Sequence, residues 1–446
     1  MDALQRIYES GVVGAGGAGF PTHIKYNTKA QYLLINAAEC EPLLFTDQYE
    51  MEHYPDEIVQ GIMIGKEILN AKEVIIGIKS KHKKSIEALT SAIEKVEAPI
   101  KIHEMESFYP AGDEQGLIFE ILNIPLNPGS IPISEGIVVT NVTTAKNIYF
   151  STIGKGVIRK TVTVTGEVKN PIVLDVSVGT SIGRCIDEAG GSSLEEYAII
   201  LGGPMMGKMA FSSDINSTFV TKTSGGIIVL PMDHPLITRR RQSIEHIKNQ
   251  TASACIQCDF CTELCPRYLI GHPLHPHEVM KAFGNDGQLQ GEKLLQASLC
   301  CECGICELYS CPMGLSPRIV NATVKKMLRE ANAPKISFDS QGVHPMEAYR
   351  RLPTDVLVKK ISIDKYYKYH NLPNKKIDSQ KVVIPMSQHI GKPAEPIVKV
   401  GDEVHANDMI GKVSMEDMGA CVHASIDGII ESVTNKEVVI KAGDRV

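Results

Sequence analysis

Nine of the twelve cysteines fall within residues 255–311, in two runs whose spacing suits iron–sulfur clusters. The first run, CIQCDFCTELCP, follows the pattern C-x2-C-x2-C-x3-C-P. The second run, CCECGICELYSCP, has its fourth cysteine one residue further along and leaves Cys301 over. In two-cluster ferredoxins the fourth cysteine of each run ligates the other cluster. The runs therefore predict two [4Fe–4S] clusters, one held by Cys255, Cys258, Cys261 and Cys311, the other by Cys300, Cys303, Cys306 and Cys265.

Two other uses of cysteine fit this pattern less well. Disulfides are typical of short secreted chains, whereas this chain has 446 residues and does not begin with a signal-peptide pattern. Structural zinc sites favour pairs of C-x2-C rather than three-plus-one runs followed by proline. We expect the four remaining cysteines to be buried or incidental thiols: Cys40, Cys185, Cys301 and Cys421.

A glycine-rich stretch near the N-terminus, GVVGAGGAGFPTH at 11–23, is either a flexible turn or a cradle for a phosphate. Residues 2–10 read as a short amphipathic helix before it, and residues 31–36 as a buried strand after it. A loop between regular elements favours phosphate binding. The spacing is not that of the usual dinucleotide fingerprint, and no P-loop lysine follows.

Length and charge set further limits. A chain of 446 residues should divide into about three domains, and a net charge of −6 argues against a nucleic-acid partner. The arginines at 239–241 are expected to start a solvated helix. Because no apolar stretch is long enough to span a bilayer, we expect a protein without a transmembrane segment, located in the cytoplasm.

Strand and helix patterns alternate in the first third of the chain. Strand-like runs at 73–79 and 135–141 flank a helical pattern at 83–96, which predicts a parallel α/β sheet. Residues 160–191 then read as alternating strands followed by a helix. We therefore predict a multidomain α/β protein whose cysteine runs lie in a separate helical part.

Four segments, in order, resemble those that hold FMN and NADH in the flavin subunit of respiratory complex I and in the RnfC protein of the Rnf complex. They are GAGGAGFPT (14–22), NAAECEP (36–42), YPAGDEQGLI (109–118) and TNVTTA (140–145). The resemblance implies that Phe20 and Glu114 face the nicotinamide cofactor. It implies FMN and phosphate contacts for Gly14, Gly16, Gly17, Gly19, Lys25, Asn36, Glu41, Asn141 and Thr144. One departure is Ala38, where complex I carries an acidic residue.

The same resemblance implies five parts. Residues 1–157 form a Rossmann-like FMN/NADH domain, 158–235 a soluble-ligand-binding β-grasp module, 236–335 a helical ferredoxin-like two-cluster domain, 336–379 a connector and 380–446 a barrel-sandwich hybrid domain. A swinging-arm carrier is not expected, because the hairpin at 414–420, SMEDMGA, has no lysine to modify. We expect this last domain to be a structural or docking module.

Domain order, LCCECGIC and CPRYLIGH (265–272) together resemble the cobalamin reductases of propanediol-utilisation microcompartments. This implies that NADH delivers a hydride to FMN, from which single electrons pass through the clusters to reduce cob(III)/cob(II)alamin to cob(I)alamin. Cobalamin would be a substrate, free or on an adenosyltransferase partner, with other microcompartment proteins as neighbours in the lumen. No corrinoid-binding histidine motif is present, and the histidines of GHPLHPH (271–277) are expected to order a loop.

Two alternatives come from other classes. An Rnf-like protein would deliver electrons from NADH to a membrane complex or partner reductase. A ligand-binding scaffold without redox activity would use the clusters only as structural elements, which the flavin-like segments argue against.

Overall fold

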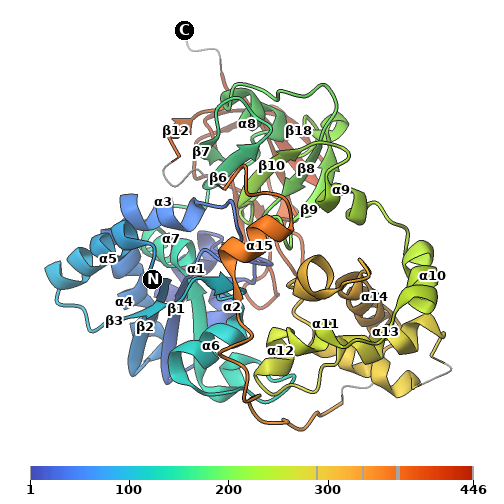
Figure 1. Cartoon of the computed structure of the whole chain (residues 1–446). Coiled ribbons are helices and arrows are strands. Elements are labelled where there is room, and N and C mark those ends of the chain that lie inside the picture. The colour runs from blue at the N-terminus through green and yellow to red at the C-terminus, as the bar shows by residue number, and fades with distance from the viewer. Residues whose placement is uncertain (1, 288–289, 334–335, 368–371, 444–446) are drawn as a thin grey trace.

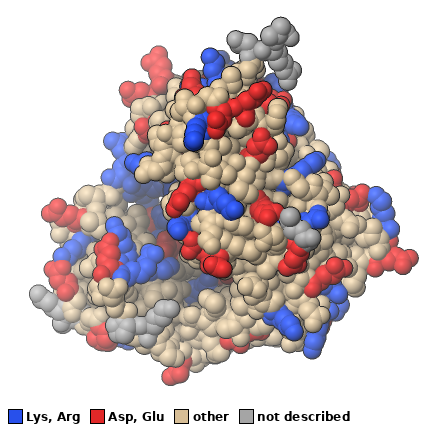
Figure 2. Space-filling model, turned by 180° about the vertical axis from the view of Figure 1, so that it is seen from behind, with Lys and Arg blue, Asp and Glu red and all other residues tan. Residues whose placement is uncertain are grey.

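The structure is a computed structural model that describes residues 2–287, 290–333, 336–367 and 372–443. Figure 1 shows the N-terminal α/β part beside the helical cysteine-bearing part, with the remaining sheets above them. Within the described ranges, no helix is long and apolar enough to cross a membrane. Seen from behind, the surface carries interspersed acidic and basic side chains and is hollowed between its upper and lower parts (Figure 2).

The N-terminal part is built on a parallel four-stranded sheet of order β3-β2-β1-β5. The predicted strands and the helix at 83–96 are confirmed to within two residues. The strands are β1 (Tyr32–Ala37), β2 (Glu73–Lys79), β3 (Lys101–Met105) and β5 (Ile137–Asn141). The helices are α1 (Ala3–Glu9), α2 (Thr22–Tyr26), α3 (Thr46–His53), α4 (Pro55–Leu69), α5 (Lys83–Lys95), α6 (Glu114–Leu122) and α7 (Val142–Thr152), with the 3-10 turn η1 (Pro132–Glu135).

Helices cover both faces of this sheet. Leu33 and Ile35 of β1 pack in one core with α4, α5 and α7, whereas the intervening Leu34 packs in another with α6. Successive side chains of a strand point to opposite faces, so a strand buried on both faces reads as a continuous apolar run. This explains why YLLINA and EVIIGIK lack the alternation of a half-exposed strand.

The second sheet has six strands in the order β12-β7-β6-β10-β8-β9. Its elements are β6 (Arg159–Gly166), β7 (Ile172–Ser177), α8 (Ile182–Glu188), β8 (Ala198–Leu201), β9 (Lys208–Phe211), η2 (Ser212–Asp214), β10 (Gly226–Leu230) and β12 (Asn374–Ile377). The edge strand β12 comes from the segment expected as a connector and pairs in parallel with β7. The connector therefore completes this sheet.

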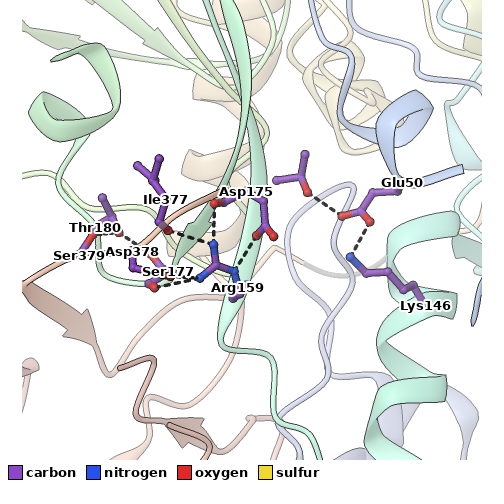
Figure 3. Close-up of polar contacts among 10 residues, drawn as sticks. Glu50, Lys146, Arg159, Asp175, Ser177, Thr180, Ile377, Asp378 and Ser379 are labelled. Atoms are coloured by element: carbon purple, nitrogen blue, oxygen red, sulfur yellow. Dashed lines mark hydrogen bonds and ion pairs between the residues drawn. The ribbon is translucent and has the colours of Figure 1, made fainter. Parts of the chain in front are cut away.

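Arg159 fastens β12 to the sheet. Its guanidinium donates to the Asp175 carboxylate at 2.9 Å, the Asp378 carboxylate at 2.9 Å and the Ile377 carbonyl at 3.0 Å (Figure 3). Nearby, the buried Glu50 carboxylate accepts from Lys146 at 2.5 Å and from Thr161 at 2.8 Å, which joins α3 and α7 to β6. The Glu50 carboxylate thus links the first two parts through its bond from Thr161.

The cysteine runs lie among short helices. These are α9 (Pro235–Arg240), α10 (Ile244–Ala254), α11 (Phe260–Glu263), α12 (Pro266–Leu269), α13 (Pro276–Gly284), η3 (Gly291–Leu299), η4 (Cys306–Ser310) and α14 (Pro317–Glu330). The prediction for the arginines was wrong. Arg239 and Arg240 end α9 rather than begin a helix, and they donate to the carbonyls of Glu307 and Pro204. Pro235 opens the helix, because proline fits its first turn.

The chain then returns across the molecule. β11 (Leu352–Pro353) pairs with β4 (Phe108–Tyr109), and α15 (Thr354–Lys360) follows between the two lower lobes of Figure 1. Two small sheets, of orders β13-β19-β18-β15 and β14-β16-β17, then form the C-terminal domain. Their strands are β13 (Lys381–Pro385), β14 (Glu395–Pro396), β15 (Glu403–Val404), β16 (Met409–Lys412), β17 (Val422–His423), β18 (Gly428–Val433) and β19 (Glu437–Lys441).

Candidate flavin site and cysteine centres

A cavity of about 390 Å³ opens where β1 and β5 end. The carboxyl ends of parallel strands are the usual ligand-binding edge of such sheets. All eleven candidate residues for flavin and nicotinamide binding line this cavity: Gly14, Gly16, Gly17, Gly19, Phe20, Lys25, Asn36, Glu41, Glu114, Asn141 and Thr144. The structure therefore brings together residues from four separate segments.

The glycine-rich loop is held in a defined shape. Gly14 N donates to the Phe20 carbonyl at 3.0 Å and closes the base of the loop. Ala15 N donates to the Thr144 hydroxyl at 2.9 Å, which ties the loop to the first turn of α7. A Cβ added to Gly17 would meet no atom of the described residues within 4 Å. Gly17 thus leaves room for a phosphate-bearing group against the backbone, and the site fits a flavin nucleotide.

The two asparagines have structural bonds as well as a place in the cavity wall. Asn141 caps α7 by accepting from Thr143 N at 2.9 Å, and its amide donates to Asp47 at 2.9 Å. Asn36 accepts from Ala38 N at 3.1 Å and donates to the Gly112 carbonyl at 3.0 Å. These bonds fix the orientation of both side chains at the cavity.

The two charged candidates at the rim pair with each other. Lys25 Nζ lies 3.0 Å from Glu114 Oε1, and Glu114 is the more exposed of the two. An anionic ligand at Lys25 would therefore compete with Glu114 for the ammonium group.

Glu41 holds a loop of the second sheet at the cavity. Its two carboxylate oxygens accept from Met205 N and Met206 N, both at 2.9 Å. Burial raises the pKa of Glu41 to about 7, and the two backbone bonds oppose that shift. Glu41 therefore positions Met206, which also lines the cavity.

This burial predicts a pH-dependent stability. Because the pKa of Glu41 is raised from 4.5 to about 7, its contribution is present in full below pH 4.5 and is lost as pH rises through 7. Replacing Glu41 with Gln should reduce the loss of stability between about pH 5 and about pH 8, by up to about 2 kcal/mol. Urea unfolding at the two pH values measures this. An identical pH dependence in parent and variant would contradict it.

The second cysteine run reaches the same cavity. Cys301 and Cys303 line its wall, and the buried Tyr109 donates its hydroxyl to the Cys303 carbonyl at 2.7 Å. Asp113, another wall residue, pairs with the buried Arg267 at 2.8 Å. The sequence interpretation missed these contacts, although Tyr109 and Asp113 lie within YPAGDEQGLI.

The structure places the fourth cysteine of each run near cysteines of the other run. Cys255, Cys258, Cys261 and Cys311 line one small pocket, so the last cysteine of the second run lies with the first run. Burial raises the pKa values of Cys300 and Cys306, and the neighbouring Cys265 thiol adds to the shift of each. The fourth cysteine of each run thus lies beside the opposite run.

Both sets suit cubane clusters. In the part of the chain that the structure describes, no three His, Cys, Asp or Glu side chains are arranged to hold a single metal ion. A cubane cluster binds each thiolate at a different iron, so its cysteines need not converge on one point. The assignment of the two four-thiolate sets to such clusters stays a prediction.

The four leftover cysteines differ in their surroundings. Cys185 and Cys421 are fully buried, as expected. Cys40 and Cys301 instead line the cavity. Among the histidines, His272 is 1% exposed, and His277 hydrogen-bonds Thr262 at 2.7 Å, so these two serve the packing of their loop.

Family comparisons divide the chain in the same order as the structure. Residues 7–150 match the Nuo51 FMN-binding domain, 161–208 the SLBB domain, 254–316 the 4Fe-4S dicluster domain and 340–445 the RnfC barrel sandwich hybrid domain. The protein is thus a multidomain α/β protein with an FMN-binding domain and a 4Fe-4S dicluster domain. These matches support FMN and two [4Fe–4S] clusters as its cofactors.

Among solved structures, a chain of the NAD⁺-reducing [NiFe]-hydrogenase in the H₂-reduced state has a similar fold. The TM-score is 0.50 at 20% identity, covering 75% of this chain and 63% of that one. Identity at this level establishes similarity of fold alone.

Curated relatives match at higher sequence identity. The RnfC-type component of the Na⁺-translocating ferredoxin:NAD⁺ oxidoreductase complex of Acetobacterium woodii is 34% identical over 60% of this chain and 58% of its own. The cobalamin reductases PduS of Salmonella typhimurium and Citrobacter freundii are 36% and 37% identical, each over 98% of this chain and 96% of its own. The chain therefore belongs to the PduS cobalamin reductase family.

Proposed function

We propose that this protein is an NADH-dependent oxidoreductase that reduces cob(III)/cob(II)alamin to cob(I)alamin. The observation that carries the proposal is the shared cavity, which is lined both by the candidate flavin-binding residues and by Cys301 and Cys303. A flavin site that adjoins a cluster site suits single-electron delivery to a metal centre. Family membership supports cobalamin as the acceptor.

Each group of residues has a part in this activity. The backbone of Gly16 and Gly17 would admit the FMN phosphate, with Lys25 adding positive charge at the rim. Phe20 and Glu114 would contact the nicotinamide cofactor. When bound, FMN converts a two-electron hydride donor into single electrons, and the clusters carry those electrons.

The two cysteine sets have different places in this scheme. The set of Cys300, Cys303, Cys306 and Cys265 would hold the cluster beside the flavin cavity, since Cys303 lines that cavity. The set of Cys255, Cys258, Cys261 and Cys311 would hold the second cluster, further from the flavin. Its rim carries the exposed apolar side chains of Ile256 and Met313.

The wider context is part of the same proposal. Cobalamin would act as a substrate, free or bound to an adenosyltransferase, in the lumen of a propanediol-utilisation microcompartment. The proposal includes a division of the chain into five parts, with boundaries at residues 157, 235, 335 and 379. It is supported by the order of the family matches, although β12 joins the second sheet from within the connector.

One alternative keeps the cofactors and changes the acceptor. Similarity to the RnfC-type component of the Acetobacterium woodii complex favours delivery of electrons to a membrane complex or partner reductase. The two functions share the flavin and cluster sites, so they differ in the acceptor alone.

An anaerobic assay of the purified holoprotein separates the two functions. We expect NADH oxidation to produce cob(I)alamin from cob(II)alamin, followed by absorbance, and omission of NADH to stop it. Viologen and quinone acceptors are assayed in parallel. Rapid reduction of those acceptors with cob(II)alamin left unreduced would overturn the cobalamin assignment and favour the Rnf-like function.

A further inference from the structure

The glycine-rich loop is held from outside by the C-terminal domain. Its inner side lines the cavity, whereas the Ala18 carbonyl accepts from Ile390 N of the C-terminal domain at 3.0 Å. Gly19 adopts φ +76°, and a Cβ there would lie 2.7 Å from His389 Cβ. The C-terminal domain therefore packs directly on the backbone of this loop.

A buried lysine makes a second connection at the start of the glycine-rich stretch. Lys222 is 2% exposed, and its ammonium donates to the Gly11 and Cys421 carbonyls, both at 2.7 Å. Its backbone N–H donates to Gln388 Oε1 at 3.0 Å. Lys222 thus links the second sheet to both the N-terminal stretch and the C-terminal domain.

Neither connection reaches the ligand. Lys222, Gln388, His389 and Ile390 do not line the cavity. Lys222 and Ile390 bond to backbone carbonyls of the glycine-rich stretch, and Gln388 bonds to the backbone of Lys222. Any influence on a bound cofactor must therefore pass through the conformation of the loop. A buried ammonium bonded to two carbonyls is costly to remove, because both oxygens then lose a charged donor.

We propose that residues 388–390 and Lys222 are positioning residues, which clamp the glycine-rich loop in the shape that binds FMN. The C-terminal domain then serves the flavin site rather than carrying a swinging arm. This inference rests on the proposed function only in naming FMN as the ligand of the loop.

The test uses the full chain depleted of flavin and titrated with FMN, with binding followed by quenching of flavin fluorescence. Lys222→Met should raise the Kd for FMN about tenfold, because the Gly11 end of the stretch is released. Gln388→Leu leaves the Lys222 ammonium in place, so it should raise the Kd for FMN by a smaller factor. Lys392→Met is the matched control, since Lys392 forms a surface pair with Asp417 in the same domain.

Hydrogen exchange of the loop amides without FMN gives an independent measurement. Residues 14–20 should exchange faster in Lys222→Met and Gln388→Leu than in the parent or in Lys392→Met. If Lys222→Met does not fold, Gln388→Leu decides the matter. Unchanged exchange together with unchanged FMN affinity would overturn the clamp. A parent that binds no FMN would overturn the proposed function, whereas the exchange measurement would still test the clamp.

Discussion

A Gly17→Val variant should contain almost no FMN and should keep its full iron content. Among the residues that the structure describes, none has an atom within 4 Å of the added Cβ, so the side chain would not disturb the fold, and Gly17 lines the cavity. Close approach of a phosphate to backbone amides requires that space. Flavin released by acid treatment and iron determined anaerobically measure both parts of the result. NADH oxidation should fall to background with the flavin.

Two further glycines sharpen this experiment. Gly291→Val is the matched control, because its Cβ also meets nothing within 4 Å in the described part of the chain and Gly291 does not line the cavity. Gly16→Val is less informative, since its Cβ would lie 2.8 Å from the Asn141 amide nitrogen and would displace a cavity residue. Stoichiometric FMN in Gly17→Val would mean that the glycines form only a turn.

Replacement of Cys303 by Ala should remove one cluster and stop cobalamin reduction. Two [4Fe–4S] clusters account for about eight irons per chain, so the variant should contain about four. NADH should still bleach the flavin, because the residues predicted to bind flavin lie in other segments of the cavity wall. Anaerobic iron analysis and rapid-mixing absorbance, following flavin and cob(I)alamin separately, measure the two effects.

Cys301→Ala provides the matched comparison. Cys301 lines the same cavity two residues away, and the spacing leaves it outside the predicted ligand set. This variant should keep about eight irons. If Cys301→Ala lost about four irons and Cys303→Ala kept all of its iron, Cys301 rather than Cys303 would be the cluster ligand. Undiminished cobalamin reduction in Cys303→Ala would make the flavin the direct donor.

Features that depend on residues close together in the sequence could be predicted. Strands β1 and β2 follow from continuous apolar runs, and the cysteine sets follow from intervals of three residues. The glycine-rich loop was found in the same way, since a loop that binds a phosphate needs small residues in succession. Such signals depend on local backbone preferences and side-chain spacing, which a single sequence displays directly.

Only the tertiary structure decided what surrounds those features. Tyr109 and Cys303 are 194 residues apart, and Lys222 lies 211 residues from Gly11, yet each pair shares a hydrogen bond. Arg240 also has a distant partner: we expected its side chain to be in solvent, but it donates to the Pro204 carbonyl. The sequence does not distinguish a buried lysine or arginine from an exposed one, because the environment of the side chain depends on which distant segments pack against it. The sequence by itself therefore determined the cofactor-binding motifs. The packing of distant segments decided that the second cysteine run reaches the candidate flavin cavity, and that the C-terminal domain contacts the glycine-rich loop.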